Sequence, residues 1–174
     1  APKANRRSGA VQLGHGFDTR LADAYYCTER SVQRPTDTLI HSWPQEIRPM
    51  STKTAIVVLS DPRTGEEALG RLFNALAAAY DFKQKNQDVQ LIFQGTGTRW
   101  TGLLANTDHP AHALYKAVED KVAGVSAGCA VFFGATEDAK RNGFSMIATN
   151  PVPGTAGLPS LASYAADGYS ILTF

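Results

Sequence analysis

The fold is decided by a short apolar run, Ala55-Ile56-Val57-Val58-Leu59, and by the turn-forming residues that end it, Ser60-Asp61-Pro62-Arg63. An uninterrupted apolar run of this length is typical of a strand that is buried on both faces, as in a parallel sheet. Thr64 and Glu67 then have the spacing of a capping box, which predicts a helix with Thr64 as its N-cap. The apolar face of that helix is expected at Leu69, Leu72, Phe73, Leu76 and Tyr80.

The alternation of strand and helix continues to the end of the chain. Apolar runs predict further strands at residues 89–93, 123–126, 144–148 and 169–174. Between them we expect helices at residues 99–105, from an N-cap at Asp108 onwards, at 136–142 and at 160–167. Such alternation implies right-handed crossovers, a mostly parallel sheet of about five strands and helices on both of its faces, which is the α/β class.

Three loops of this fold should meet at one edge of the sheet. Ligands of parallel α/β sheets usually bind beyond the carboxyl ends of the strands. That edge collects the loops Ser60-Asp61-Pro62, Gln94-Gly95-Thr96 and Gly128-Cys129. The sequence therefore predicts one site, with Cys129 as its catalytic group and with substrate-binding residues Ser60, Asp61, Gln94, Gly95, Thr96, Gly128 and Ala130.

Cys129 stands where the predicted strand 123–126 leaves the sheet, ahead of the helix expected at 136–142. Unpaired backbone N–H groups and the positive end of a helix dipole favour thiolate over thiol, and thiolate is the reactive form. On this interpretation, N–H groups near Gly128 to Ala130 hold the developing anion. The alternative is an inert, packed Cys129, because free cysteine is among the most often buried side chains.

Composition excludes several classes of protein. The 174 residues are 43% hydrophobic and 19% charged, which is typical of a globular protein, and no apolar run reaches the about 18 residues of a transmembrane helix. The formal net charge of +1 gives no electrostatic case for binding nucleic acid or an anionic membrane. Two cysteines, Cys27 and Cys129, make no disulfide framework and no zinc-ligand spacing, so we expect no metal site and a reducing, cytoplasmic setting.

Residues 1–49 differ from the rest of the chain. They contain six arginines, four prolines and no sustained periodicity, so they are expected to be an irregular N-terminal extension to a domain at 50–174. Met50 directly precedes the first strand, as at an ordinary protein start, which leaves two interpretations open. Either the natural product begins at Met50, or residues 1–49 are an arm that docks on a neighbouring subunit.

Two further motifs have alternative interpretations. Gly95-Thr96-Gly97-Thr98 follows a strand and could cradle a phosphate, but it lacks the dinucleotide and P-loop spacings, so a tight turn that needs glycine torsions is the alternative. His109 and His112 lie three residues apart, which could place both on one helix face, yet with no matching carboxylate or cysteine we expect surface or capping roles. Trp100 either lines a pocket rim or an interface, or packs in the interior.

The order of these elements resembles the DsrE/DsrF-like family over residues 52–174. The resemblance rests on residues 56–62, the helix from Glu66, residues 91–95, residues 122–130 with 133–135, and residues 167–174. It implies a three-layer α/β/α, flavodoxin-like domain, usually assembled into homo-oligomers. Its best understood members relay sulfur as a cysteine persulfide in sulfur oxidation or tRNA thiolation pathways.

The resemblance implies that Cys129 matches the active cysteine of the family, in the loop after a central strand. Similar sequences often carry Cys-x-x-Cys here, whereas this chain has Ser126-Ala127-Gly128-Cys129, so it lacks a resolving thiol. The leading hypothesis is a sulfur carrier or sulfurtransferase-like protein that uses Cys129, a donor or acceptor protein and no cofactor. The alternatives are a non-catalytic module of the same fold that binds a small molecule or partner, with an inert Cys129, and a nucleotide or flavin binder.

Overall fold

The computed structural model describes residues 53–174, which form an α/β domain around one parallel sheet. The strand order is β4-β3-β2-β1-β5, and every neighbouring pair is parallel. The strands are β1 (Lys53–Val58), β2 (Val89–Phe93), β3 (Val122–Ser126), β4 (Met146–Ile147) and β5 (Tyr169–Thr173). This confirms the predicted α/β class and five-stranded sheet. The N-terminal extension 1–49, the boundary at residue 50 and Cys27 lie outside the described residues.

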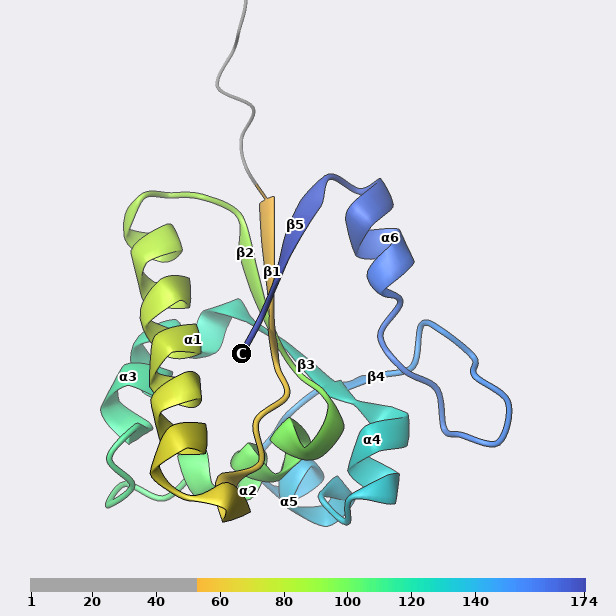
Figure 1. Cartoon of the computed structure of the whole chain (residues 1–174), viewed down its shortest axis with the longest axis horizontal. Helices are drawn as coiled ribbons and strands as arrows, with labels where there is room; N and C mark the ends of the chain where they lie inside the picture. The colour runs from red at the N-terminus through yellow and green to blue at the C-terminus, as the bar shows by residue number, and fades with distance from the viewer. Residues whose placement is uncertain (1–52) are drawn as a thin grey trace, which may run out of the picture. The chain divides into compact units, whose positions relative to one another are not determined.

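Helices lie on both faces of the sheet, as predicted for a three-layer fold. Figure 1 shows α1 and α3 on one side of the strands and α6 on the other, with α2, α4 and α5 gathered beyond the strand ends. The helices are α1 (Glu66–Gln84), α2 (Trp100–Leu104), α3 (His112–Val118), α4 (Ala127–Phe132), α5 (Thr136–Arg141) and α6 (Leu161–Ala166), with short 3-10 turns η3 (Pro62–Thr64), η4 (Gly95–Arg99) and η5 (Glu119–Lys121). No helix within residues 53–174 combines the length and the apolar composition needed to cross a membrane.

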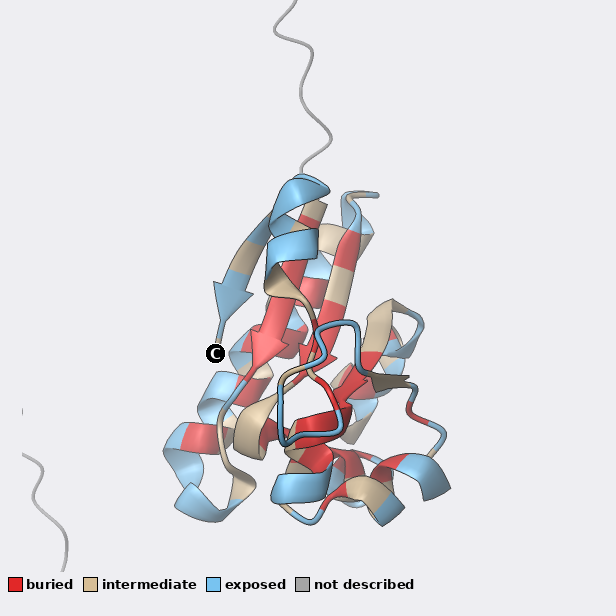
Figure 2. Cartoon of the chain, turned by 90° about the vertical axis from the view of Figure 1, so that its right-hand side faces the viewer, coloured by how far each residue is buried: buried red, intermediate tan, exposed pale blue. Residues whose placement is uncertain are grey.

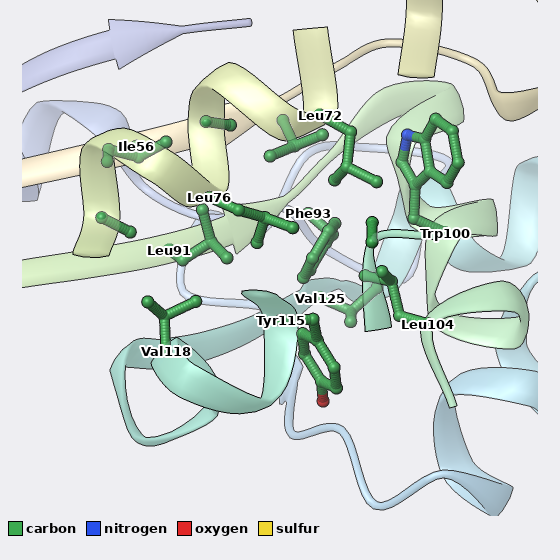
Figure 3. Packing of buried hydrophobic residues seen from close by; sticks show 14 of the residues in the cluster. Ile56, Leu72, Leu76, Leu91, Phe93, Trp100, Leu104, Tyr115, Val118 and Val125 are labelled. Carbon is green, nitrogen blue, oxygen red and sulfur yellow. The ribbon is translucent and has the colours of Figure 1, made fainter. Parts of the chain in front are cut away.

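The apolar run that decided the fold forms the centre of the sheet. Ile56 and Val58 pack into the larger core cluster under α1 and α3, while Ala55 and Val57 pack into the smaller cluster beneath α6. Side chains of a strand alternate between faces, so a strand with helices on both sides needs apolar residues at every position. Figure 3 shows the larger cluster, in which Trp100 packs near Leu104 and Phe93. Figure 2 shows that β1, β2 and β3 are largely buried, whereas β5 and α6 are mostly exposed.

The predicted capping box at the start of α1 is wrong. Asp61, rather than Thr64, caps the first turn, because Pro62 begins η3 and the Asp61 side chain accepts a hydrogen bond from the Arg63 backbone. The Thr64 hydroxyl donates to the Asp61 carbonyl at 2.9 Å, and α1 starts only after Gly65, whose φ of 89° redirects the chain. Glu67 pairs with Arg71 one turn further along α1.

Two other local predictions are also wrong. Asp108 does not cap a helix, because its backbone N–H donates to the Asn106 side chain in a turn, and α3 begins at His112 after Ala111. Tyr80, expected on the inner face of α1, is 41% exposed; the small residues Ala75 and Ala79 are buried there instead.

Candidate functional site

Cys129 lies in the first turn of a helix that the sequence did not predict. α4 begins directly after β3, and Ser126, which is fully buried, is its N-cap. The Ser126 hydroxyl accepts a hydrogen bond from the Cys129 backbone N–H at 3.4 Å. The predicted strand end at residue 126 is confirmed, and a Ser at that end was the signal that could have revealed the helix. The thiol is thus carried by a helix rather than by an open loop.

The Cys129 side chain is partly exposed and lines a pocket of about 380 Å³. One wall is α4 with the residues after it, and the other is formed by residues 150–158, which we call the strap. None of the residues that line the pocket carries a charge; they are Gly128, Cys129, Val131, Phe132, Phe133, Gly154, Thr155, Ala156 and Leu158. Phe132 and Val131 are 83% and 61% exposed, so the pocket opens onto an apolar surface.

The strap is held against α4 through two glycines. The Gly128 backbone N–H donates to the Gly157 carbonyl at 2.6 Å, and Asn150 and Leu158 form an antiparallel bridge that closes the strap on itself. A Cβ at position 128 would lie 2.9 Å from the Gly157 carbonyl oxygen and 3.2 Å from a methyl group of Leu158. Gly128 is therefore needed because the strap backbone approaches it closely.

Gly128→Ala is expected to push the strap away from α4 and to destabilise the domain by about 1–3 kcal/mol, the usual range for overpacking. Because the strap forms one wall of the pocket, native-state alkylation of Cys129 by iodoacetamide should become faster. Peptide mapping gives the alkylation rate, and thermal unfolding gives the stability. Gly70→Ala is the matched control, because a Cβ there meets nothing within 4 Å on α1. An unchanged alkylation rate in a destabilised Gly128→Ala protein would contradict the prediction.

The structure does not gather all eight predicted site residues around one cavity. Gly128 and Cys129 line the pocket described above, but Ala130 is fully buried in the larger core cluster. Ser60 lines a different pocket of about 370 Å³, together with Thr64, Arg71 and Phe174. The remaining members of the set, which are Asp61, Gln94, Gly95 and Thr96, lie at the same edge of the sheet without lining the Cys129 pocket.

These other residues mostly make contacts within the fold. The Thr96 hydroxyl donates to the Leu59 carbonyl at 2.9 Å, and Asp61 is paired with Arg99. Within residues 53–174, the Ser60 hydroxyl and the Gln94 side-chain carbonyl oxygen are buried without a hydrogen-bond partner. Buried polar groups are normally paired, so these two oxygens mark polar positions at the carboxyl ends of β1 and β2.

Two of the backbone N–H groups predicted to hold an anion at Cys129 already donate hydrogen bonds within the fold. The N–H of Gly128 donates to the strap, and that of Cys129 donates to Ser126. The Gly95–Thr98 segment is likewise a 3-10 turn in which the Gly97 N–H donates to the Gln94 carbonyl at 3.1 Å. A tight turn is thus the structure of this glycine-rich segment.

A family model of the DsrE/DsrF-like family matches residues 52–174. The chain belongs to the DsrE/DsrF-like family. This confirms the family that the sequence pattern suggested, and the parallel sheet agrees with its three-layer, flavodoxin-like fold. In this DsrE/DsrF-like chain the cysteine after the third strand is Cys129, and Ser126 occupies the position three residues before it.

Two further comparisons add little to the family assignment. No curated protein matches the chain. Among solved structures, a conserved protein of unknown function from Bacteroides thetaiotaomicron is 13% identical, with a TM-score of 0.48; the match covers 70% of this chain and 95% of the other. This similarity is too distant to carry an argument about function.

His109, His112 and Trp100 have structural contacts in this DsrE/DsrF-like domain. Burial, and to a lesser degree the neighbouring His112, lower the pKa of His109, whose Nδ1 accepts the Ala111 N–H at 3.2 Å. The His112 ring contacts the Leu104 carbonyl at 2.7 Å. Trp100 is buried in the core and donates to the Ser60 carbonyl. Among residues 53–174, no group of three or more His, Cys, Asp or Glu side chains is arranged to hold a metal ion.

Sequence reasoning missed Arg99 at this edge of the sheet. Arg99 follows the glycine-rich turn and contacts both Asp61 after β1 and Phe133 after α4. No local pattern could reveal this role, because its two partners lie far from it in the sequence. Only their shared position beyond the strand ends, which the α/β topology predicts, could have suggested the contact.

Proposed function

We propose that this chain handles sulfur by carrying it as a persulfide on Cys129. The observation that supports this most strongly is the position of Cys129, a partly exposed thiol in the first helical turn after β3, lining a pocket at the carboxyl edge of the sheet. Ligands of α/β folds usually bind at this edge. The family resemblance adds that DsrE-like members relay sulfur on a cysteine in the corresponding place.

The proposed step needs no cofactor or oxidant. The Cys129 thiolate attacks the outer sulfur of a donor persulfide, a new S–S bond forms at Cys129, and the S–S bond of the donor breaks. The donor leaves as a thiolate that takes up a proton, so the oxidation state of the sulfur is conserved in the transfer. A thiol on an acceptor then attacks the outer sulfur of the Cys129 persulfide and removes it. With no second cysteine at position 126, release depends on that external thiol.

The test is the mass of the protein after exposure to a persulfide donor. In a Cys27→Ser background, a gain of one sulfur atom is expected on the native protein, reversed by dithiothreitol. Replacing Cys129 by Ser in the same background should abolish this gain completely, while thermal unfolding should change little because Cys129 is partly exposed. A sulfur adduct that persists in the Cys129→Ser protein would reject the proposal, as would an adduct that forms only after denaturation.

A second candidate function is that of a binding module whose Cys129 is not reactive. The exposed Phe132 and Val131 beside the pocket favour it, because large apolar side chains on a surface often mark contact with a partner. Under either proposal we expect the chain to form homo-oligomers. The sulfur-carrier proposal further requires a donor or acceptor protein and a reducing compartment such as the cytoplasm. If the native protein gains no sulfur but still binds a partner protein, the sulfur-carrier proposal is rejected and this second candidate is supported.

A further inference from the structure

We infer that Arg99 is a positioning residue for the Cys129 pocket, fixing the Phe133 wall through a charged link to Asp61; its relevance to sulfur transfer rests on the function proposed above. The link joins three segments that are separate in sequence. They are the turn after β1, the 3-10 turn η4 after β2, and the end of α4 after β3. All three lie beyond the carboxyl ends of the strands.

The pair of Arg99 and Asp61 is the best shielded ion pair within the described residues. Its side chains are only 20% and 18% exposed, and Arg99 Nη1 lies 2.5 Å from Asp61 Oδ2. The other Asp61 oxygen accepts the Arg63 backbone N–H, so the carboxylate is itself fixed as the cap of η3. A guanidinium held by a fixed, largely buried carboxylate has little freedom to move.

Arg99 holds Phe133 by two contacts. Its Nε donates to the Phe133 carbonyl at 3.2 Å, and its guanidinium carbon lies 5.4 Å from the centre of the Phe133 ring. The Phe133 N–H in turn donates to the Cys129 carbonyl at 2.8 Å. Phe133 is therefore bonded to Arg99 on one side and to the backbone of Cys129 on the other. Both Phe133 and Cys129 line the pocket.

Lysine cannot replace Arg99 in this arrangement. The planar guanidinium directs separate N–H groups to Asp61 and to the Phe133 carbonyl while its carbon atom lies over the Phe133 ring. An ammonium is a single, strongly hydrated point charge without a flat face. Arg99→Lys keeps the charge beside Asp61 but frees the wall of the pocket, so it separates electrostatic stabilisation from positioning.

The experiment compares two maleimides on Cys129 in the Cys27→Ser protein. N-phenylmaleimide and N-ethylmaleimide react with a thiolate in the same way but differ in the apolar group that the pocket must accommodate. The ratio of their rates therefore depends on how well the pocket wall accommodates the phenyl group. A change in the thiolate fraction of Cys129 affects both rates equally and cancels in this ratio. Arg99→Lys is expected to lower the ratio of the N-phenylmaleimide rate to the N-ethylmaleimide rate about threefold or more. For comparison, one methylene group in a well-formed apolar pocket changes such a rate ratio roughly tenfold.

Arg71→Lys is the matched control, because Arg71 also pairs with a carboxylate, Glu67, but on the exposed surface of α1. Its ratio should equal that of the unaltered protein. An unchanged ratio in folded Arg99→Lys overturns the inference. If Arg99→Lys does not fold, Asp61→Asn carries the same prediction, because the amide keeps the acceptor for Arg63 and loses the charge that holds Arg99.

The outcome is separate from that of the persulfide experiment. If the unaltered protein gains no sulfur but Arg99→Lys lowers the maleimide ratio, the proposed function is rejected and the positioning role stands. If the protein gains sulfur normally and the ratio does not change, the positioning role is rejected and the function stands. Since a general loss of stability would raise both maleimide rates together, a selective loss of the phenyl reagent is the result that supports positioning.

Discussion

Gly97→Ala is expected to lower the free energy of unfolding by about 3 kcal/mol, the upper end of what overpacking usually costs. A Cβ at position 97 would lie 2.2 Å from the Val58 carbonyl oxygen and 2.8 Å from its carbonyl carbon. Val58 is paired with Phe93 across the sheet, and its carbonyl also accepts the Gln94 N–H at 3.0 Å. These backbone atoms cannot move aside without disturbing the pairing of β1 and β2.

Urea unfolding followed by circular dichroism measures this loss, and Gly102→Ala is the comparison. A Cβ at position 102 would also be too close to a neighbour, at 2.7 Å, but that neighbour is the carboxylate oxygen of Asp138. A side chain can rotate away, so Gly102→Ala should destabilise the domain much less than Gly97→Ala. Equal losses for the two variants would show that the close approach of η4 to β1 is not what Gly97 provides.

Trp100→Ala is expected to destabilise the domain by about 3–5 kcal/mol, as truncation of a large buried aromatic usually does. Trp100 is only 2% exposed and is one of the largest side chains of the core (Figure 3). Its indole Nε1 donates to the Ser60 carbonyl at 2.8 Å, which ties α2 to the turn after β1. Trp100→Phe should therefore cost about 1–3 kcal/mol, because it fills much of the space but leaves the Ser60 carbonyl without this donor.

Both Trp100 variants are compared with Leu103→Ala, on the same helix. Leu103 is 41% exposed, so its truncation should change the free energy of unfolding by about 0.5 kcal/mol or less. The expected order of stability is Leu103→Ala, then Trp100→Phe, then Trp100→Ala, in equilibrium urea unfolding. If Trp100→Ala were as mild as Leu103→Ala, Trp100 would belong to a surface rather than to the core.

The sheet could be predicted from the sequence because its strands are short apolar runs bounded by turns. Ala55–Val58 is buried on both faces, and this burial requires the continuous apolar pattern from which the strand was inferred. Helix starts were less predictable, since Pro62 and Asp61 formed their own turn before α1 could begin. α4 has six residues, most of them apolar, and a segment this short carries no periodicity that separates helix from strand.

The position of the candidate site was more predictable than the walls of its pocket. The rule that ligands bind beyond the strand ends led to Cys129 and to the loops after β1 and β2. The strap and the Arg99 link were not predictable, because each depends on a contact between distant segments, such as that of Gly128 with Gly157. The sequence also suggests free N–H groups at Gly128 and Cys129, because it does not show the hydrogen bonds that these groups donate within the fold.

The shielding of the Arg99–Asp61 pair makes the link from Asp61 to the Phe133 wall insensitive to the salt concentration around the protein. Dissolved salt weakens exposed pairs such as Arg71–Glu67, because mobile ions gather around their charges, but it reaches largely buried pairs far less. Concentrated electrolyte would therefore loosen the outer surface of α1 and leave the wall at Phe133 in place. The Phe133 wall of the Cys129 pocket would then keep its geometry in dilute and in salt-rich media.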